Sequence, residues 1–399
     1  MPMGKGFAIT SDLNLRKILL TGYEKHTRRP EEEDGPSSKR RKLYSLPKLK
    51  IAAITNDTVA TLASLAYAVK SLPNSRVAMG IIVGTGCNAT IPMKLSALHE
   101  SKAKHVSSTS ANAEETIVNT EWTISGAAPP LRELAIITKW DDELDRACAR
   151  PGFQPFEYMT GGRYIGELIR LILLDYLTNL AGVLKEKLPV TLLEEYALTT
   201  TYISDTAARA RSDQDLADEV NKSWAPPETS EWRWDSKTAG AFRKIARTVQ
   251  RRSSGLIAAA VVGLLACARE IELKVDSHEN SPNPASSGQN GHVDVQSGSF
   301  TLGPEASGTS NSTNSQSPIV PVLTPPPADW QSGPEELVVA YTGGIIQNYP
   351  NFKEMCQQHI DRLIMRTGPQ KSGKSVFLRE ACDGGVIGAG VLAGMVVDG

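Results

Sequence analysis

The amino-acid sequence predicts an α/β protein with a sizeable buried core. Strand-like and helix-like segments alternate from about residue 51 to residue 270, which is typical of an α/β architecture. Hydrophobic residues make up 40% of the 399 residues and charged residues 22%, an ordinary balance for a globular protein. A chain of this length can form one large domain or two smaller ones.

Charge and cysteine content argue against several classes of protein. The 43 Lys and Arg nearly cancel the 44 Asp and Glu, so there is no electrostatic reason to expect a nucleic-acid partner. The five cysteines are scattered and never spaced C-x-x-C, which indicates a reducing compartment and no metal site. The longest apolar stretch, residues 255–268, is too short to cross a bilayer, and the N-terminus lacks the apolar core of a signal peptide. We therefore expect a soluble cytoplasmic protein without a membrane partner.

The first elements lie on either side of a charged segment. Residues 24–48 combine an acidic run with Pro, Ser and the basic run Lys39-Arg40-Arg41-Lys42, and we expect a solvated loop there. The basic run fits a nuclear import signal; the alternative is a loop that only keeps the surface hydrated. Residues 51–67 (IAAITNDTVATLASLAY) begin as an apolar strand and end as an amphipathic helix. Asp57, between the two halves, fits a helix cap, a proton acceptor or both.

The middle of the chain continues the alternation. Residues 76–83 predict an apolar strand that runs into a Gly-Thr-Gly turn. Residues 163–184 and 238–270 have helical spacing of apolar residues. Residues 275–334 are rich in Ser, Asn, Gly and Pro and too poor in apolar residues to offset chain entropy, so we expect a disordered insertion.

The last part of the chain contains two glycine-rich segments. From Leu337 (LVVAYTGGIIQNYPNFKEM) we expect a strand, a Gly-Gly turn, a second strand and a helix. The terminal VFLREACDGGVIGAGVLAGMVV predicts a strand, a Gly-rich turn and an apolar helix. Residues 368–375 (GPQKSGKS) satisfy the pattern G-x-x-x-x-G-K-[ST], but that loop binds phosphate only between a strand and a helix N-terminus. Here a helix-like segment precedes it and a strand-like segment follows, which favours a flexible basic loop.

Polar residues in unusual places indicate a ligand site. Gly84, Thr85 and Gly86 can turn backbone amides toward an anion, and Asn88 follows closely. Glu121 and Glu157 lie beside aromatic residues, where a carboxylate loses solvation without partners. A polyol ligand could supply those partners, because one carboxylate accepts from two neighbouring hydroxyls. The alternative is that Glu157 helps to start a helix and Glu121 is a surface acid.

Four successive motifs resemble those of the hexokinase family, in the family's order: IAAITNDTVATL, MGIIVGTGCN, NTEW and FEYMTGGRYIGELIRLILL. GKGFAI resembles the family's sugar loop, VAYTGGIIQNYPNFKE its adenosine-side hairpin, and CDGGVIGAGVLA the turn that closes the nucleotide site. The resemblance covers nearly the whole chain outside the two low-complexity segments. It implies the actin-like ATPase (ribonuclease H-like) hexokinase fold, with a nearly complete large lobe and a partial small lobe.

The resemblance also implies a division of the chain. Residues 1–75 are expected to be a remnant of the small lobe that carries the charged loop at 24–48. Residues 76–381 form the large lobe, interrupted by the insertion at 275–334. Residues 382–399 form the Gly-rich turn and a C-terminal helix that returns toward the small lobe.

The implied reaction is phosphoryl transfer from ATP, with Mg²⁺, to a hexose such as glucose, giving hexose 6-phosphate. Asp57 takes the position of the general base that accepts the proton of the sugar's primary hydroxyl. The positions that match the family's sugar contacts are Lys5, Asn56, Asn88, Glu121 and Glu157. Those that match its nucleotide contacts are Gly84, Thr85, Gly86, Gly343 and Gly384.

The sequence also departs from the family pattern. It has no match to the Gly-rich first phosphate loop of the type LDxGGTNxR, and one lost donor can cost roughly 3 to 4 kcal/mol at a transition state. Gly4 replaces the sugar-loop threonine, Thr342 replaces an acidic residue, and Gly385-Val386 replace Ser-Gly on the nucleotide side. Sugar-side positions match better than nucleotide-side ones. The alternative function is therefore a hexokinase-like regulator that binds sugar without turnover.

Overall fold

The computed structural model describes residues 14–26, 46–69, 74–122, 127–274, 335–366, 368–370 and 373–397. Apart from Lys274, they belong to one compact unit, Met1–Leu273 with Pro334–Gly399. Lys5, the basic run Lys39–Lys42 and the insertion at 275–334 lie outside the described residues, so the predictions for them remain predictions.

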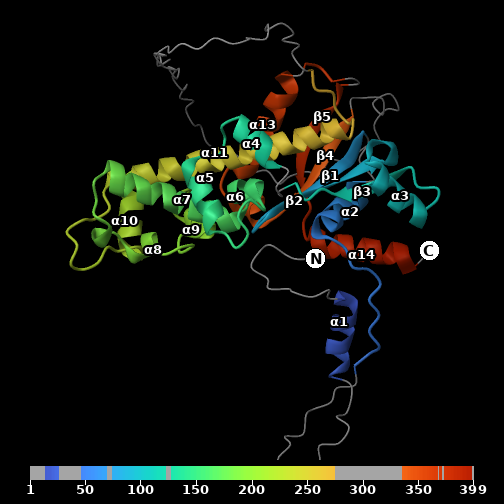
Figure 1. Cartoon of the computed structure of the whole chain (residues 1–399), viewed down its shortest axis with the longest axis horizontal. Helices are drawn as coiled ribbons and strands as arrows, with labels where there is room; N and C mark the ends of the chain where they lie inside the picture. Colours follow the sequence, from blue (N-terminus) through green and yellow to red (C-terminus); the bar gives the residue numbers. More distant parts are fainter. Residues whose placement is uncertain are drawn as a thin grey trace, which may run out of the picture. The chain divides into compact units, whose positions relative to one another are not determined.

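The unit contains one mixed five-stranded sheet among the described residues (Figure 1). Its order is β3-β2-β1-β4-β5; β2 runs antiparallel to β1 and β3, whereas β1, β4 and β5 are parallel. The central strands β1 and β4 are continuous apolar runs because both of their faces are covered. The strands span Ser75–Val83 (β1), Cys87–Lys94 (β2), Glu115–Asn119 (β3), Glu336–Thr342 (β4) and Ser375–Glu380 (β5).

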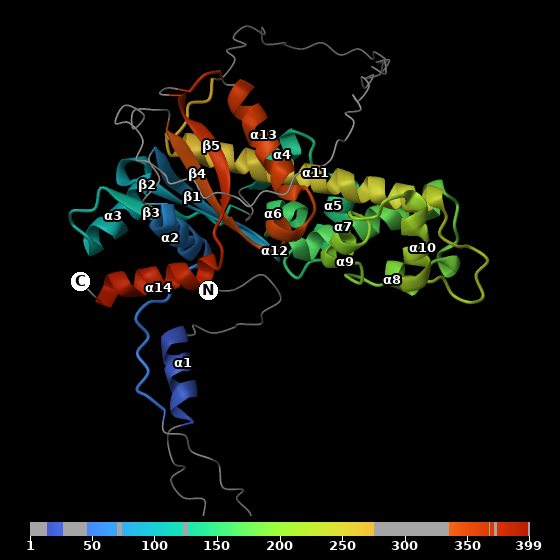
Figure 2. The ribbon, with the colours of Figure 1, turned by 180° about the vertical axis from the view of Figure 1, so that it is seen from behind.

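Two hydrophobic cores cover opposite faces of this sheet. Successive side chains of a strand point to opposite faces, and β4 divides accordingly: Leu337 and Val339 belong to the large core, Val338 and Ala340 to the small one. The small core lies under α2 (Asp57–Val69), which packs on β1 and against the C-terminal helix α14 (Gly384–Val397). Figures 1 and 2 both show α2 and α14 side by side.

The large core lies between the sheet and a set of helices built around α7, α11 and α13 (Figure 2). The helix α11, Ser236–Cys267, confirms the predicted helical stretch and packs along α13. The other α-helices are α1 (Leu15–Glu24), α3 (Glu100–Thr109), α4 (Ala128–Glu133), α5 (Lys139–Ala147), α6 (Pro155–Thr160), α7 (Gly162–Asp175), α8 (Val190–Leu193), α9 (Thr200–Asp205), α10 (Asp213–Ser223), α12 (Gly344–Asn348) and α13 (Phe352–Arg366).

Three predicted elements differ in the structure. Residues 51–56 form no strand, and among the described residues no strand pairs with them; the carbonyl of Ile51 instead accepts from the guanidinium of Arg16, at 2.6 Å. The predicted helix at 163–184 ends as α7 at Asp175 and widens into a π-helical turn, Tyr176–Leu180, before Gly182 takes a φ of 69°. The predicted second strand after Gly343 is the short helix α12, because Gly343 has a φ of 120° and turns the chain away from the sheet.

The contact between α14 and α2 depends on a glycine and gives the first testable prediction. A Cβ on Gly388 would lie 1.8 Å from the carbonyl oxygen of Ala60, so Gly388→Ala forces the two helices apart. We expect a loss of about 1–3 kcal/mol in the free energy of unfolding, measured with a chemical denaturant. The matched control is Gly390→Ala in the same helix, where a Cβ meets nothing within 4 Å. This control should be neutral or stabilising by up to about 1 kcal/mol; equal losses in both variants would contradict the prediction.

Candidate active site

Strand β2 brings the first predicted site residues together. The Nδ2 amide of Asn88 donates to Oδ1 of Asn119, 2.7 Å away, and to Oε1 of Glu121, 3.1 Å away. Nδ2 of Asn119 also donates to Oε1 of Glu121, at 2.9 Å. Glu121 is half-buried and takes a φ of 44° just after β3, which turns its carboxylate back to the strand pair. Two amides and one carboxylate therefore form a single polar cluster.

Glu157 of α6 is hydrogen-bonded to the first residue of the same strand. It is 1% exposed in the first turn of α6, and its Oε2 accepts the backbone N–H of Cys87 at 3.1 Å. Cys87 directly precedes Asn88, and its Sγ lies 2.8 Å from Oγ1 of Thr160. The position of Glu157 in a first helical turn is also favourable to that helix. The structure thus places this buried carboxylate one residue along β2 from the Asn88 cluster.

Asn56 and Asp57 are connected to β2 through hydroxyl groups. Asp57 is exposed, begins α2, and accepts the backbone N–H of Thr58 through Oδ1 at 3.0 Å. Asn56 Oδ1 accepts the same N–H at 2.9 Å and the Thr58 hydroxyl at 2.5 Å. The hydroxyl of Thr58 in turn forms a short hydrogen bond with that of Thr90 on β2. Thr90 is two residues from Asn88 and therefore points to the same face of the sheet.

The Gly84–Gly86 turn is fixed against two helix starts. The N–H of Gly84 donates to the carbonyl of Gly86 at 2.9 Å, which closes the turn between β1 and β2. The N–H groups of Gly162 and Arg163, at the start of α7, donate to the carbonyls of Gly84 and Thr85 at 2.8 and 3.0 Å. Gly343 lies on the other side: a Cβ there would be 2.5 Å from the carbonyl of Val83. Only glycine fits this approach at a φ of 120°.

Gly384 occupies a different place from the other predicted nucleotide-side glycines. It begins α14, and a Cβ on it would lie 3.3 Å from Cα of Thr61 in α2. Val386, two residues later, is 80% exposed.

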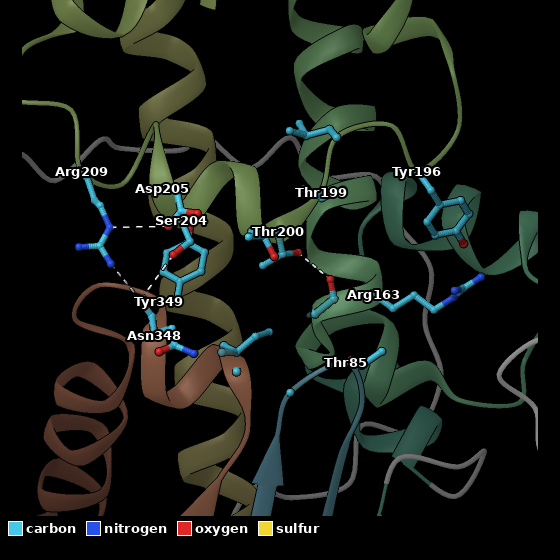
Figure 3. Close-up of a pocket in the computed structure, with 16 residues that line it drawn as sticks. Thr85, Arg163, Tyr196, Thr199, Thr200, Ser204, Asp205, Arg209, Asn348 and Tyr349 are labelled. Atoms are coloured by element: carbon cyan, nitrogen blue, oxygen red, sulfur yellow. Dashed lines mark hydrogen bonds and ion pairs between the residues drawn. The ribbon is translucent and has the colours of Figure 1, made fainter. Parts of the chain in front are cut away.

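A cavity of about 680 Å³ opens beside the Gly84–Thr85 turn (Figure 3). Its polar walls include Arg163 of α7, Thr200 and Ser204 of α9, Arg209, and Asn348 of α12. Thr200 accepts the N–H of Gly166 and donates to the carbonyl of Gly162, so it joins α9 to α7. Tyr196 and Tyr349 also line the cavity, and Gly344 contributes only backbone to its wall.

Sequence reasoning missed the cavity residues on α9. The run of hydroxyl residues from Thr199 to Ser204 was the available signal. It is ambiguous because such runs also cap helices, and the hydroxyl of Thr199 does accept the N–H of Tyr202 at the start of α9.

Burial raises the pKa of two phenols near these regions above the ordinary value of a tyrosine. It raises the pKa of Tyr164 to about 12, and the charge of Glu157 adds to the effect. Burial also raises the pKa of Tyr196, with Cys148 as the next contributor. Both phenols therefore remain neutral near pH 7 and act as hydrogen-bonding or packing groups, not as bases.

The described residues around the G-x-x-x-x-G-K-[ST] pattern at 368–375 do not have the strand–loop–helix order of a phosphate loop. Helix α13 precedes them and β5 begins at Ser375, as the sequence predicted. Lys374, the lysine of the pattern, donates to the carbonyl of Glu270 at 3.1 Å and lies 3.2 Å from Oε2 of Glu335. Its charge is thus directed to carboxylates of the chain itself.

Metal-ligand clusters and membrane-spanning helices are both absent from the part of the chain that the structure describes. They contain no group of three or more His, Cys, Asp or Glu side chains that could hold a metal ion. None of the helices described is long and apolar enough to pass through a membrane.

Comparison with known proteins places the chain in a family. The family model described as hexokinase matches residues 78–395. The chain is 40% identical to hexokinase-3 of Mus musculus over 136 residues, which is 34% of this chain and 13% of the mouse protein. It is 25% identical to the chloroplastic hexokinase-2 of Nicotiana tabacum over 346 residues, which is 86% of this chain and 53% of the tobacco protein.

The fold agrees with that placement. The structure of hexokinase from Schistosoma mansoni complexed with glucose matches with a TM-score of 0.55 and 22% identity, over 86% of this chain and 57% of the other. The chain therefore spans about half the length of the proteins that it matches over most of its own length. The fold is the actin-like ATPase fold of hexokinases. Since the family model covers most of the sequence, the chain belongs to the hexokinase family.

Proposed function

We propose that this chain acts in ATP-dependent phosphorylation of a hexose such as glucose. The observation that carries the proposal is the grouping along β2: Asn88 and Glu121 share hydrogen bonds, and Glu157 binds the adjacent backbone N–H. Carboxylates and amides placed together suit a ligand with several neighbouring hydroxyls, because each can accept from or donate to them. Lys5 and Asn56 are the remaining proposed sugar contacts.

Asp57 is the proposed general base. It is exposed at the start of α2, so a substrate hydroxyl can reach it. The oxygen of the hexose primary hydroxyl bonds to the terminal phosphorus of ATP, its proton passes to Asp57, and ADP leaves. The residues on β2 and its neighbours hold the hexose so that this oxygen is in position.

The cavity beside the Gly84–Thr85 turn is the proposed ATP site, with Gly86 completing the turn and Gly343 packing behind it. Its volume of about 680 Å³ is in the range of small-molecule sites. Arg163 and Arg209 line it and can disperse the negative charge of phosphates. Mg²⁺ is held largely by substrate phosphates and water in such reactions, so a dedicated cluster of protein ligands is not required.

A second candidate function is a sugar-binding regulator without turnover. Two observations favour it. Among the described residues that line the cavity, none comes from α14, although the resemblance implies that Gly384 contacts the nucleotide. Val386 is exposed and bulky where the family has a small residue.

Calorimetry with glucose, followed by an assay for ATP-dependent hexose 6-phosphate, tests the proposal. Binding and turnover together support the phosphotransferase, and binding alone supports the regulator. Glu157→Gln, which keeps the side-chain size but removes the charge, should abolish measurable binding in either case. Wild-type protein that folds but binds no hexose would contradict both functions.

The nucleotide cavity gives the second testable prediction. Gly344 lines the cavity, and a Cβ there would meet only the Asn348 amide, 4.0 Å away. Gly344→Leu should therefore fill part of the cavity without disturbing the fold and weaken ATP binding by at least about tenfold, or ~1.4 kcal/mol. Gly263→Leu in α11, where a Cβ meets nothing within 4 Å, is the matched control. If calorimetry gives the same ATP affinity for the Gly344 variant as for wild type, the nucleotide binds somewhere other than this cavity.

A further inference from the structure

A buried pair of hydroxyl groups joins α2 to the sheet. Thr58 and Thr90 are both 0% exposed, and their Oγ1 atoms form a short hydrogen bond between the first turn of α2 and β2. Thr58 also contacts Oδ1 of Asn56 through its hydroxyl, at 2.5 Å. The three side chains form a continuous chain of hydrogen bonds that ends next to Asp57.

The direction of this chain is fixed by a backbone group. The N–H of Thr58 can only donate, and it lies 2.9 Å from Oδ1 of Asn56, so the atom of Asn56 that faces α2 is the oxygen. That oxygen accepts, hence the Thr58 hydroxyl donates its only hydrogen to it. The Thr58 oxygen must then accept from Thr90. The order is Thr90 to Thr58 to Asn56.

This order determines what Asn56 offers to a ligand. Its oxygen already receives two donors from Thr58. Its Nδ2 lies on the opposite side of the planar amide and points away from them. An amide free to rotate could present either end, but the N–H and the hydroxyl of Thr58 both hold its oxygen. The hydrogen bond from Thr90 keeps the Thr58 hydroxyl turned toward Asn56 as a donor.

We propose that the Thr90–Thr58 pair is a positioning device that makes Asn56 a hydrogen-bond donor toward the hexose. The inference rests on the proposed function. The primary hydroxyl then accepts from Asn56 Nδ2 while it donates its proton to Asp57, the next residue. Only a group that both accepts and donates fits, which selects a hydroxyl at that position of the sugar. Thr90 acts through Asn56 and does not touch the substrate.

The test compares glucose with 6-deoxyglucose, which lacks the primary hydroxyl. Thr90→Val keeps the shape of the side chain but removes its donor, and should weaken glucose binding about tenfold. Binding of 6-deoxyglucose should not change, because that ligand has no hydroxyl for Asn56. Thr90→Ser restores the donor and should restore glucose affinity. Thr116→Val on the neighbouring strand β3 is the control for the same chemical change. The proposal would be overturned if the ratio of glucose affinity to 6-deoxyglucose affinity were the same in Thr90→Val as in wild type.

A second measurement separates this inference from the proposed function. The side-chain amide signals of Asn56, assigned with Asn56→Asp, can be followed by ¹⁵N NMR without any sugar. We expect them to shift in Thr90→Val and to return in Thr90→Ser. If wild type binds no glucose, the proposed function fails, but these signals still test whether Thr90 and Thr58 position Asn56. Identical signals in Thr90→Val and wild type would refute that positioning role.

Discussion

Replacing Asp57 by asparagine is expected to lower the rate of hexose phosphorylation by about 10²–10⁴-fold while leaving hexose affinity nearly unchanged. An amide has the size of the carboxylate but cannot accept the proton of the primary hydroxyl near pH 7. The fold should tolerate the change. Asp57 Oδ1 accepts the N–H of Thr58 at the start of α2, and asparagine oxygen serves as well in that role.

The measurement is the initial rate of hexose 6-phosphate formation, with calorimetry on the same preparations to follow hexose binding. Asp215→Asn is the matched control, since Asp215 is also an exposed aspartate in the first turn of a helix, α10. It removes the same charge far from the proposed site in the sequence and should leave the rate unchanged. An Asp57→Asn protein that retains the wild-type rate would show that another group accepts the proton.

The sequence predicted the central strands well because buried strands have a simple signature. Residues 76–83 form a continuous apolar run that ends in a turn, and β1 follows it within one residue. Short apolar runs without a partner were less informative. Residues 51–55 have the composition of a strand, but strand formation depends on a neighbour that local sequence does not reveal. The prediction for the residues after Gly343 was wrong for another reason: IIQN suits a strand or a helix, and the φ of Gly343 directs the chain into a helix.

The sequence named candidate site residues but not the hydrogen bonds that connect them. Asn88 and Glu121 were assigned to one ligand through the family resemblance, and the structure shows them hydrogen-bonded. Asn119 and Thr90, which connect them to each other and to α2, were not predicted. Their roles follow from the pairing of Thr90 with Asn119 across β2 and β3. A register of that kind is a long-range property, since one residue of slippage would turn every side chain to the other face.

Replacing Arg170 by alanine is expected to have the largest effect on stability, about 3–5 kcal/mol, which is a large part of the stability of a typical domain. Arg170 and Glu167 lie one turn apart on α7, and both side chains are only 5% exposed. Arg170 binds both carboxylate oxygens of Glu167, at 2.8 and 2.6 Å, and donates to the carbonyl of Leu192 at 2.7 Å. Without the guanidinium, a buried carboxylate loses its counter-charge. Chemical denaturation monitored by circular dichroism measures the loss.

The control is an ion pair with the same chemistry on the surface. Lys104 and Glu100 are one turn apart on α3, and their side chains are 75% and 76% exposed. Lys104→Ala should cost no more than about 0.5 kcal/mol, because water already solvates both charges. The double variant Glu167→Met with Arg170→Met separates the cost of an unpaired Glu167 carboxylate from the cost of losing the contacts of the Arg170 side chain. If the cost of Arg170→Ala comes from the unpaired carboxylate, removing both charges must be less damaging than removing the arginine alone.

The same ion pair connects stability to the proposed ATP site. Glu167 Oε2 also accepts the backbone N–H of Tyr196 at 2.6 Å, and Tyr196 lines the cavity beside the Gly84–Thr85 turn. Loss of the pair should therefore loosen the Tyr196 segment before the sheet unfolds. In the double Met variant, ATP affinity should fall even where the free energy of unfolding recovers, because methionine cannot accept that N–H. If ATP affinity and stability recover together, the pair serves the core alone and the cavity wall is held by other contacts.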